Sequence, residues 1–179
     1  MPIQVWVLVA LVLLAALLGR GLSAWRKFRG RRLVTCPENQ RPAGVKLDSS
    51  LAVRSGLLHA PKLQLAECTR WPERAGCGQE CLREIESRPA DCLVRNIVLK
   101  WYDGKVCCSC GRSFGAILAA GAQPAVLVAD KSSVEWSEIP VDRLPDTLAA
   151  GKPICFACHL ASKMVREHPD LITNRSVRT

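Results

Sequence analysis

The chain has 179 residues, of which 25 are Lys or Arg and 16 are Asp or Glu, giving a formal net charge of +9. Aromatic residues make up only 5% while ten residues are cysteines, so we expect one or two small domains held together partly by disulfides or metal, and no large core. Six of the basic residues precede residue 33, which leaves +3 for the remainder and argues against nucleic-acid binding.

An almost uninterrupted apolar segment occupies residues 3–19, and small apolar residues with a tryptophan follow it. At about 1.5 Å per residue, a helix over residues 3–25 is long enough to cross the roughly 30 Å hydrocarbon layer of a bilayer. We therefore expect a transmembrane anchor at residues 1–25, in contact with the bilayer through residues 3–25. A secretory signal peptide is the alternative, because Gly21 and Ser23 offer a small-x-small cleavage pattern.

A basic collar follows the apolar segment at residues 26–32, and no acidic residue precedes it. The basic residues after the apolar run are Arg20, Arg26, Lys27, Arg29, Arg31 and Arg32. The positive-inside rule then predicts a single-pass protein of the inner membrane, with the N-terminus outside and the C-terminal domain in the cytoplasm. Anionic lipid headgroups are the expected partners near Arg20 to Arg32.

Residues 33–104 are expected to form a cysteine-rich α+β half. Two short extended segments, Leu33 to Cys36 and Ala43 to Leu47, flank a turn and predict a hairpin, and residues 61–67 predict a third strand ending at Cys68. Residues 77–87 are rich in helix formers.

A second helix is predicted to start at Pro89 and to end at Asp103-Gly104. Its apolar residues recur on one face, which is typical of a helix packed against a core. These residues are Leu93, Val94, Ile97, Val98 and Trp101.

Residues 105–179 are expected to form a zinc-ribbon-like half. Two strands are predicted at Ala125 to Ala129 and Val134 to Ile139, and a short helical turn at Pro145 to Ala150. A final helix begins near His159 and stops before Pro169. The predicted fold class is thus α+β, with an N-terminal transmembrane helix followed by a small zinc-stabilised domain.

Two Cys-x-x-Cys clips carry the strongest chemical signal. They are Cys107 with Cys110, followed directly by Gly111, and Cys155 with Cys158, and 44 residues separate them. Each clip places two thiolates on one side of a tight turn, and two such clips are the usual ligand source of a tetrahedral zinc site. A glycine after the second cysteine suits a turn that needs a positive φ.

The clips leave alternatives open. Cys108 could replace Cys107 as a ligand, and His159 could replace Cys158. The segment CFACH also matches a covalent haem c attachment site at Cys155, Cys158 and His159, which would make the chain a membrane-tethered electron carrier. Zinc is favoured, because haem would leave the first clip without a partner and the collar keeps the domain on the cytoplasmic side.

A second cysteine group lies in the 33–104 half. Its expected ligands to a second, less certain zinc ion are Cys36, Cys68, Cys77 and Cys81, with Cys92 as a substitute for Cys36. Cys77 and Cys81 are spaced i, i+4 on the predicted helix and would project from one face. Burial as small apolar core residues is the alternative for this group.

The pieces CTRWPERAGCGQECL, WYDGKVCCSCGRSFG and CFACHLASKMVREHPDL resemble an uncharacterised family of small, single-span, cysteine-rich bacterial membrane proteins. This resemblance covers most of residues 33–179 and implies the layout of the chain but no activity. The two clips also resemble a zinc ribbon.

The function expected from the sequence is that of a membrane-anchored, zinc-binding interaction or scaffold module at the cytoplasmic face. It would hold one zinc ion, or two, and an unknown protein partner. Catalysis is not expected, because the chain contains no His-Glu-x-x-His motif, nucleophile elbow or phosphate loop.

Overall fold

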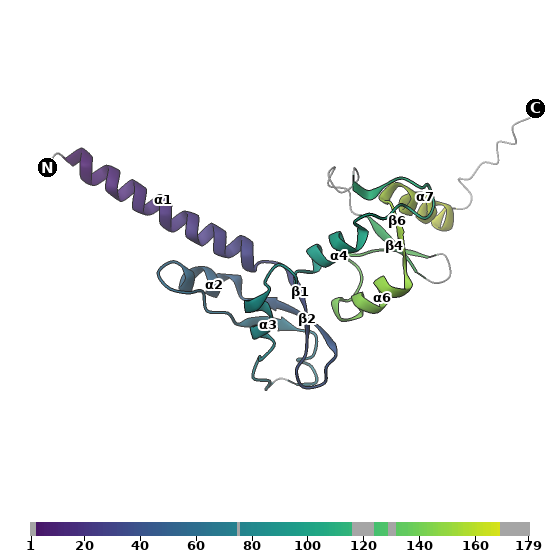
Figure 1. Ribbon diagram of the computed structural model, residues 1–179, viewed down its shortest axis with the longest axis horizontal. Coiled ribbons are helices and arrows are strands. Elements are labelled where there is room, and N and C mark those ends of the chain that lie inside the picture. The colour runs from purple at the N-terminus through teal and green to yellow at the C-terminus, as the bar shows by residue number, and fades with distance from the viewer. Residues whose placement is uncertain (1–2, 75, 116–123, 129–131, 169–179) are drawn as a thin grey trace, which may run out of the picture. The chain divides into compact units, whose positions relative to one another are not determined.

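The computed structural model describes residues 3–74, 76–115, 124–128 and 132–168. It has the predicted α+β class, with a long N-terminal apolar helix followed by small antiparallel sheets and helices (Figure 1). The chain divides into two compact units, Met1–Asn96 and Ile97–Thr179. Each unit has its own three-stranded sheet.

Helix α1 (Ile3–Phe28) is the one described helix that is long and apolar enough to cross a membrane. Most of its side chains are exposed, but Gly21, Ala24 and Phe28 are buried in the first unit. Helix α2 (Ser49–Gly56) runs alongside this end of α1 (Figure 1). The end of the apolar helix is therefore also part of the folded unit.

The sequence reading missed α2, although the residue before it carries a start signal. Asp48 Oδ1 accepts hydrogen bonds from the backbone N–H groups of Ser50 and Leu51, both at 2.9 Å. Such an N-cap satisfies N–H groups that the first turn of a helix leaves unpaired.

The first sheet contains β1 (Arg31–Thr35), β2 (Pro42–Leu47) and β3 (Leu65–Cys68), with β2 in the centre and antiparallel to both neighbours. This arrangement confirms the predicted hairpin and third strand. The apolar core of the unit lies between the sheet, the end of α1, α2 and α3 (Leu82–Ser87). Its described members include Val34, Ala43, Val45, Leu47, Ala52, Leu65 and Ile85.

Arg32 does not belong to the exposed part of the basic collar. Its side chain is fully buried, and its guanidinium donates to the backbone carbonyls of Pro89 and Lys27. Burial lowers its pKa, and the nearby Cys92 thiol acts in the opposite direction. The expected lipid contact of the collar therefore does not extend to Arg32.

The helix predicted over residues 77–87 is too long at its start. Cys77 lies outside regular structure, Gln79 has a φ of 55°, and α3 begins only after Cys81. A positive φ interrupts a right-handed helix, so the i, i+4 argument for Cys77 and Cys81 is wrong. Helix α4 (Val94–Tyr102) starts later than predicted and ends before Gly104, whose φ is +68°.

The second sheet has the order β5-β4-β6, and all its pairs are antiparallel. Its unit contains β4 (Ala125–Leu127), β5 (Ser133–Glu135), the 3-10 turn η2 (Val141–Arg143), α6 (Leu144–Ala150), β6 (Lys152–Ile154) and α7 (Phe156–Glu167). Both predicted strands are present, and both are shorter than predicted within the described residues. Ala129, the predicted end of the first strand, is not among the described residues. Strand β6 was not predicted. Tyr102 joins α4 to the sheet by donating a 2.7 Å hydrogen bond to Ala125 O.

Candidate metal centre

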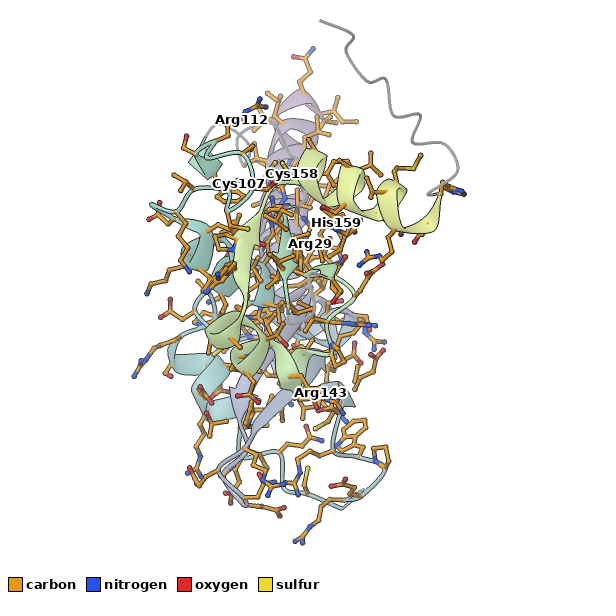
Figure 2. All side chains as sticks on the ribbon, turned by 90° about the vertical axis from the view of Figure 1, so that its right-hand side faces the viewer. Arg29, Cys107, Arg112, Arg143, Cys158 and His159 are labelled. Atoms are coloured by element: carbon orange, nitrogen blue, oxygen red, sulfur yellow. The ribbon has the colours of Figure 1, made fainter. Side chains whose placement is uncertain are left out.

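Four cysteine thiols converge in the second unit. The Sγ atoms of Cys107, Cys110, Cys155 and Cys158 all lie within 4.8 Å of one another. The Cys110 and Cys155 sulfurs are 3.8 Å apart, and a tetrahedron with Zn–S bonds of about 2.3 Å has edges of about 3.8 Å. Figure 2 shows Cys107 and Cys158 next to each other at the start of α7. The spacing of the sulfurs therefore fits one tetrahedrally bound metal ion.

A tight turn shapes the first clip. Val106 and Ser113 pair across it as an isolated β-bridge, and Cys107 N donates to Arg112 O at 2.9 Å. Gly111 closes the turn by donating to Cys107 O at 2.9 Å, and its φ is +71°. The glycine after the clip predicted this positive φ. Residues with a Cβ atom rarely adopt it.

The second clip is carried by the junction of β6 and α7. Cys155 follows the strand and is the N-cap of α7, and Cys158 lies in the first turn of that helix. Two hydrogen bonds connect the clips: Cys155 N donates to Cys107 Sγ at 3.3 Å, and Cys108 N donates to Pro153 O at 2.9 Å. The backbone N–H groups of Cys155 and Cys108 therefore connect the second clip to the first.

The pKa values of Cys107 and Cys158 shift in opposite directions. Burial opposes ionisation of Cys107, but the backbone N–H groups of Cys110, Cys155 and Ser109 outweigh it and lower its pKa to about 6. For Cys158 the Ser109 hydroxyl favours the thiolate, yet the other three cysteine side chains and burial raise its pKa to about 12. The Cys107 thiol therefore ionises more readily than an ordinary cysteine, and the thiolate is the form that binds zinc.

The structure separates the two alternatives that adjoin the clips. Cys108 is exposed and is not among the converging thiols. His159 is buried, but its Nδ1 lies 2.8 Å from Ser133 Oγ and its Nε2 lies 4.0 Å from Glu135 Oε1. Among the described residues, the four cysteines are therefore the group that could hold a metal ion, and His159 connects α7 to β5.

The second cysteine group is arranged differently. Cys36, Cys68, Cys77 and Cys81 all line one cavity of about 280 Å³ in the first unit. Among the described residues, however, the Cys107 group is the one set whose ligand atoms already converge. Cys92 is buried apart from the cavity, with its Sγ 4.0 Å from Glu84 O.

Burial and neighbouring groups also shift the pKa values of two cavity thiols, Cys81 and Cys36. Burial raises the pKa of Cys81 to about 11, and the thiols of Cys68, Cys77 and Cys36 add to this effect. Burial opposes ionisation of Cys36, but the N–H of Glu38 and the Arg70 guanidinium lower its pKa overall.

Sequence reasoning missed three polar residues that contact His159 or Cys36. Ser133 and Glu135 contact His159 from alternate positions of β5, and side chains at alternate strand positions lie on one face of a sheet. Arg70 donates to Cys36 Sγ at 2.8 Å across 34 residues of sequence, and no local pattern indicates that contact.

Comparisons with protein-family models, with curated proteins and with solved structures give no match for this chain. The resemblance to a family of single-span, cysteine-rich proteins therefore stays a prediction. The four-cysteine group and the apolar helix are the observations from which function is inferred.

Proposed function

We propose that this protein is a membrane-anchored interaction module at the cytoplasmic face, stabilised by a zinc ion bound to Cys107, Cys110, Cys155 and Cys158. The observation that carries the proposal is the convergence of these four sulfurs within 4.8 Å. Tetrahedral sets of four thiolates are typical of structural zinc and of iron bound to sulfur. The metal would link the turn after α4 to the junction of β6 and α7.

The metal is proposed to be structural rather than catalytic. Catalytic zinc keeps one coordination position open for water or substrate, whereas four thiolates close the tetrahedron. The second sheet is small, because it consists of three strands of three residues each. A metal link between segments 48 residues apart would stabilise such a unit directly.

Two observations support zinc over covalent haem. Haem attachment would use Cys155 and Cys158 for thioethers, but both sulfurs lie with those of Cys107 and Cys110. It would also require His159 to bind iron, yet this ring is buried against Ser133 and Glu135. We therefore retain haem only as the result that would overturn the zinc proposal.

The membrane anchor is proposed to be α1. Its length and composition suit a bilayer span or a signal sequence alike. Burial of Gly21 and Ala24 against α2 supports an anchor, because cleavage after Ser23 would remove part of the folded unit. The basic residues that follow the apolar segment support a cytoplasmic location of the domain.

An exposed apolar face on α7 supports a role in binding another protein. Phe156, Leu160 and Met164 are spaced i, i+4, i+8 and are all exposed in the second unit. Side chains at this spacing form one stripe along a helix. The zinc ligands at the start of α7 would fix the position of this stripe.

Metal analysis of the purified full-length chain in detergent tests the zinc site. We expect bound zinc to be lost from this unit when Cys107 and Cys155 are both replaced by serine, and the unit to unfold because zinc binding and folding are linked. The matched control is Cys108→Ser, which removes a neighbouring exposed thiol and should retain the metal. A Soret band from covalent haem, or unchanged zinc in the double variant, would refute the proposal.

Reporter fusions test the proposed orientation separately. A fluorescent protein at the C-terminus should be active, and alkaline phosphatase at the same position should be inactive, because that enzyme needs the oxidising side of the membrane. The opposite pair of results would place the domain outside the cytoplasm.

A further inference from the structure

A cavity in the first unit collects four cysteines that the proposed zinc site does not use. Cys36 follows the end of β1, Cys68 ends β3, and Cys77 and Cys81 lie in the segment before α3. All four are half-buried, and all four line the cavity. Three separate segments of the chain therefore present thiols to one space.

The pairing of the first sheet explains why Cys68 faces the cavity. Val34 faces Ala43 across β1 and β2, and Val45 faces Cys68 across β2 and β3. Facing residues project to the same side of a sheet, as do residues two apart along a strand. Cys68 therefore projects with Val34, Ala43 and Val45 toward the cavity, which they all line.

Charged groups around the cavity suit an anionic cluster of thiolates. Arg70 Nη1 donates to Cys36 Sγ at 2.8 Å, and Glu38 accepts contacts from Arg70 at 3.6 Å and from Arg74 at 3.1 Å. A zinc ion with four thiolates carries a net negative charge, and hydrogen-bond donors to the sulfurs commonly stabilise such sites. Arg70 would be such a donor to the Cys36 sulfur.

The geometry points to a second structural zinc site in this cavity, formed by Cys36, Cys68, Cys77 and Cys81. Their sulfurs are not yet gathered like those of the Cys107 group, so metal binding requires them to move toward one another. Glycines at 76 and 78 flank Cys77 and give its segment the backbone freedom for that movement.

Such a site would add links between the sheet and a segment that has no helix or strand of its own. Residues 69–74 and 76–81 form only turns and irregular structure between β3 and α3. Gln79 Oε1, which accepts from Leu65 N at 3.0 Å, is one of the few side-chain contacts that attach this segment to a strand. Zinc would add links from Cys77 and Cys81 to the ends of β1 and β3. Cys92 is not a ligand in this arrangement, because it is buried beside Glu84.

The test is the zinc content of the purified full-length chain in detergent, with free thiols and intact mass measured on the same preparation before any reductant is added. We expect about two zinc ions per chain in the wild type. The Cys107→Ser/Cys155→Ser variant should retain about one, which isolates the cavity site without altering its ligands. The Cys36→Ser/Cys81→Ser variant should also retain about one, and Cys92→Ala should retain both.

Two results would overturn the second site. One is a wild-type chain with a single zinc ion that disappears completely in the Cys107→Ser/Cys155→Ser variant. The other is a disulfide among the four cavity cysteines, seen as a loss of free thiols and a mass lower by two hydrogens. Either result leaves the first site intact, whereas retention of all zinc by the Cys107→Ser/Cys155→Ser variant would contradict the proposed function alone.

Discussion

His159 follows a proposed zinc ligand directly, and its two ring nitrogens nevertheless face β5. Nδ1 lies 2.8 Å from the buried Ser133 hydroxyl, and Nε2 lies 4.0 Å from Glu135. The helix therefore has two attachments near its start: the thiols of Cys155 and Cys158 on one side, and this imidazole on the other. The second attachment is independent of metal.

Replacing His159 by alanine should lower the free energy of unfolding of the metal-loaded chain by roughly 1 to 3 kcal/mol, because it leaves the buried Ser133 hydroxyl without its partner. Zinc content should not change. Chemical denaturation and metal analysis of the same preparations measure both quantities. His168→Ala is the matched control, since His168 is exposed at the other end of α7. Loss of zinc in the His159 variant would instead identify the imidazole as a ligand.

The pKa values of Cys107 and Cys158 predict how zinc affinity depends on pH. Zinc binds thiolates, so the proton that Cys158 holds up to about pH 12 must be displaced. Affinity should therefore rise at least about tenfold per pH unit above pH 6. It should fall more steeply below about pH 6, where Cys107 also takes up a proton. Competition with a chelator of known proton affinity measures this slope, and a flat profile between about pH 6 and 8 would contradict it.

The junction of α6 and β6 positions the second clip, and Gly151 makes that junction compact. Its N–H donates to Thr147 O at 2.8 Å as α6 ends, and β6 starts at the next residue. A methyl group at this position would overlap with Val126 Cγ1 and lie 2.6 Å from Thr147 O. Only glycine allows the helix end to approach the central strand so closely.

Gly151→Ala should therefore destabilise the second unit by roughly 1 to 3 kcal/mol, because the clash involves a backbone carbonyl and a packed strand. Thermal unfolding of the metal-loaded protein measures the change. Gly115→Ala provides the comparison, since a methyl group there has no described atom within 4 Å. Equal melting temperatures for the two variants would show that the junction can adjust.

Elements with a strong local signal were predictable, and elements held by distant contacts were not. The hairpin of β1 and β2, the clip turn at Gly111 and the helical turn before Gly151 all carry turn or breaker residues. Helix α2 was missed despite the Asp48 N-cap, because its short apolar face packs on the distant α1. Strand β6 was missed because its three residues include a proline and it lies at the edge of the sheet. The helix predicted from Cys77 failed at Gln79, whose positive φ no helix propensity indicates.

At the scale of the whole molecule, the two ends of α1 differ: the first part suits a lipid environment and the last turns pack in the first unit. Its first part is exposed and apolar, which suits lipid, whereas its last turns carry small residues that let α2 approach. A Cβ at Gly21 would lie 3.4 Å from Leu57 and 3.6 Å from Val53. The first unit is therefore continuous with the proposed anchor, and no flexible linker separates them within the described residues.

This continuity predicts that the chain keeps its apolar segment and stays in the membrane. Cleavage after Ser23 would remove Gly21 and expose the apolar side chains of α2 that pack on it, so an uncut helix is the more stable arrangement. Mass spectrometry of protein purified from membranes should give a mass that includes residues 1–23. Alkaline carbonate should leave the protein in the membrane pellet, because an apolar helix of this length inserts in the bilayer. A shorter mass that starts at Ala24, together with release into the soluble fraction, would identify the segment as a signal peptide and rule out the anchor.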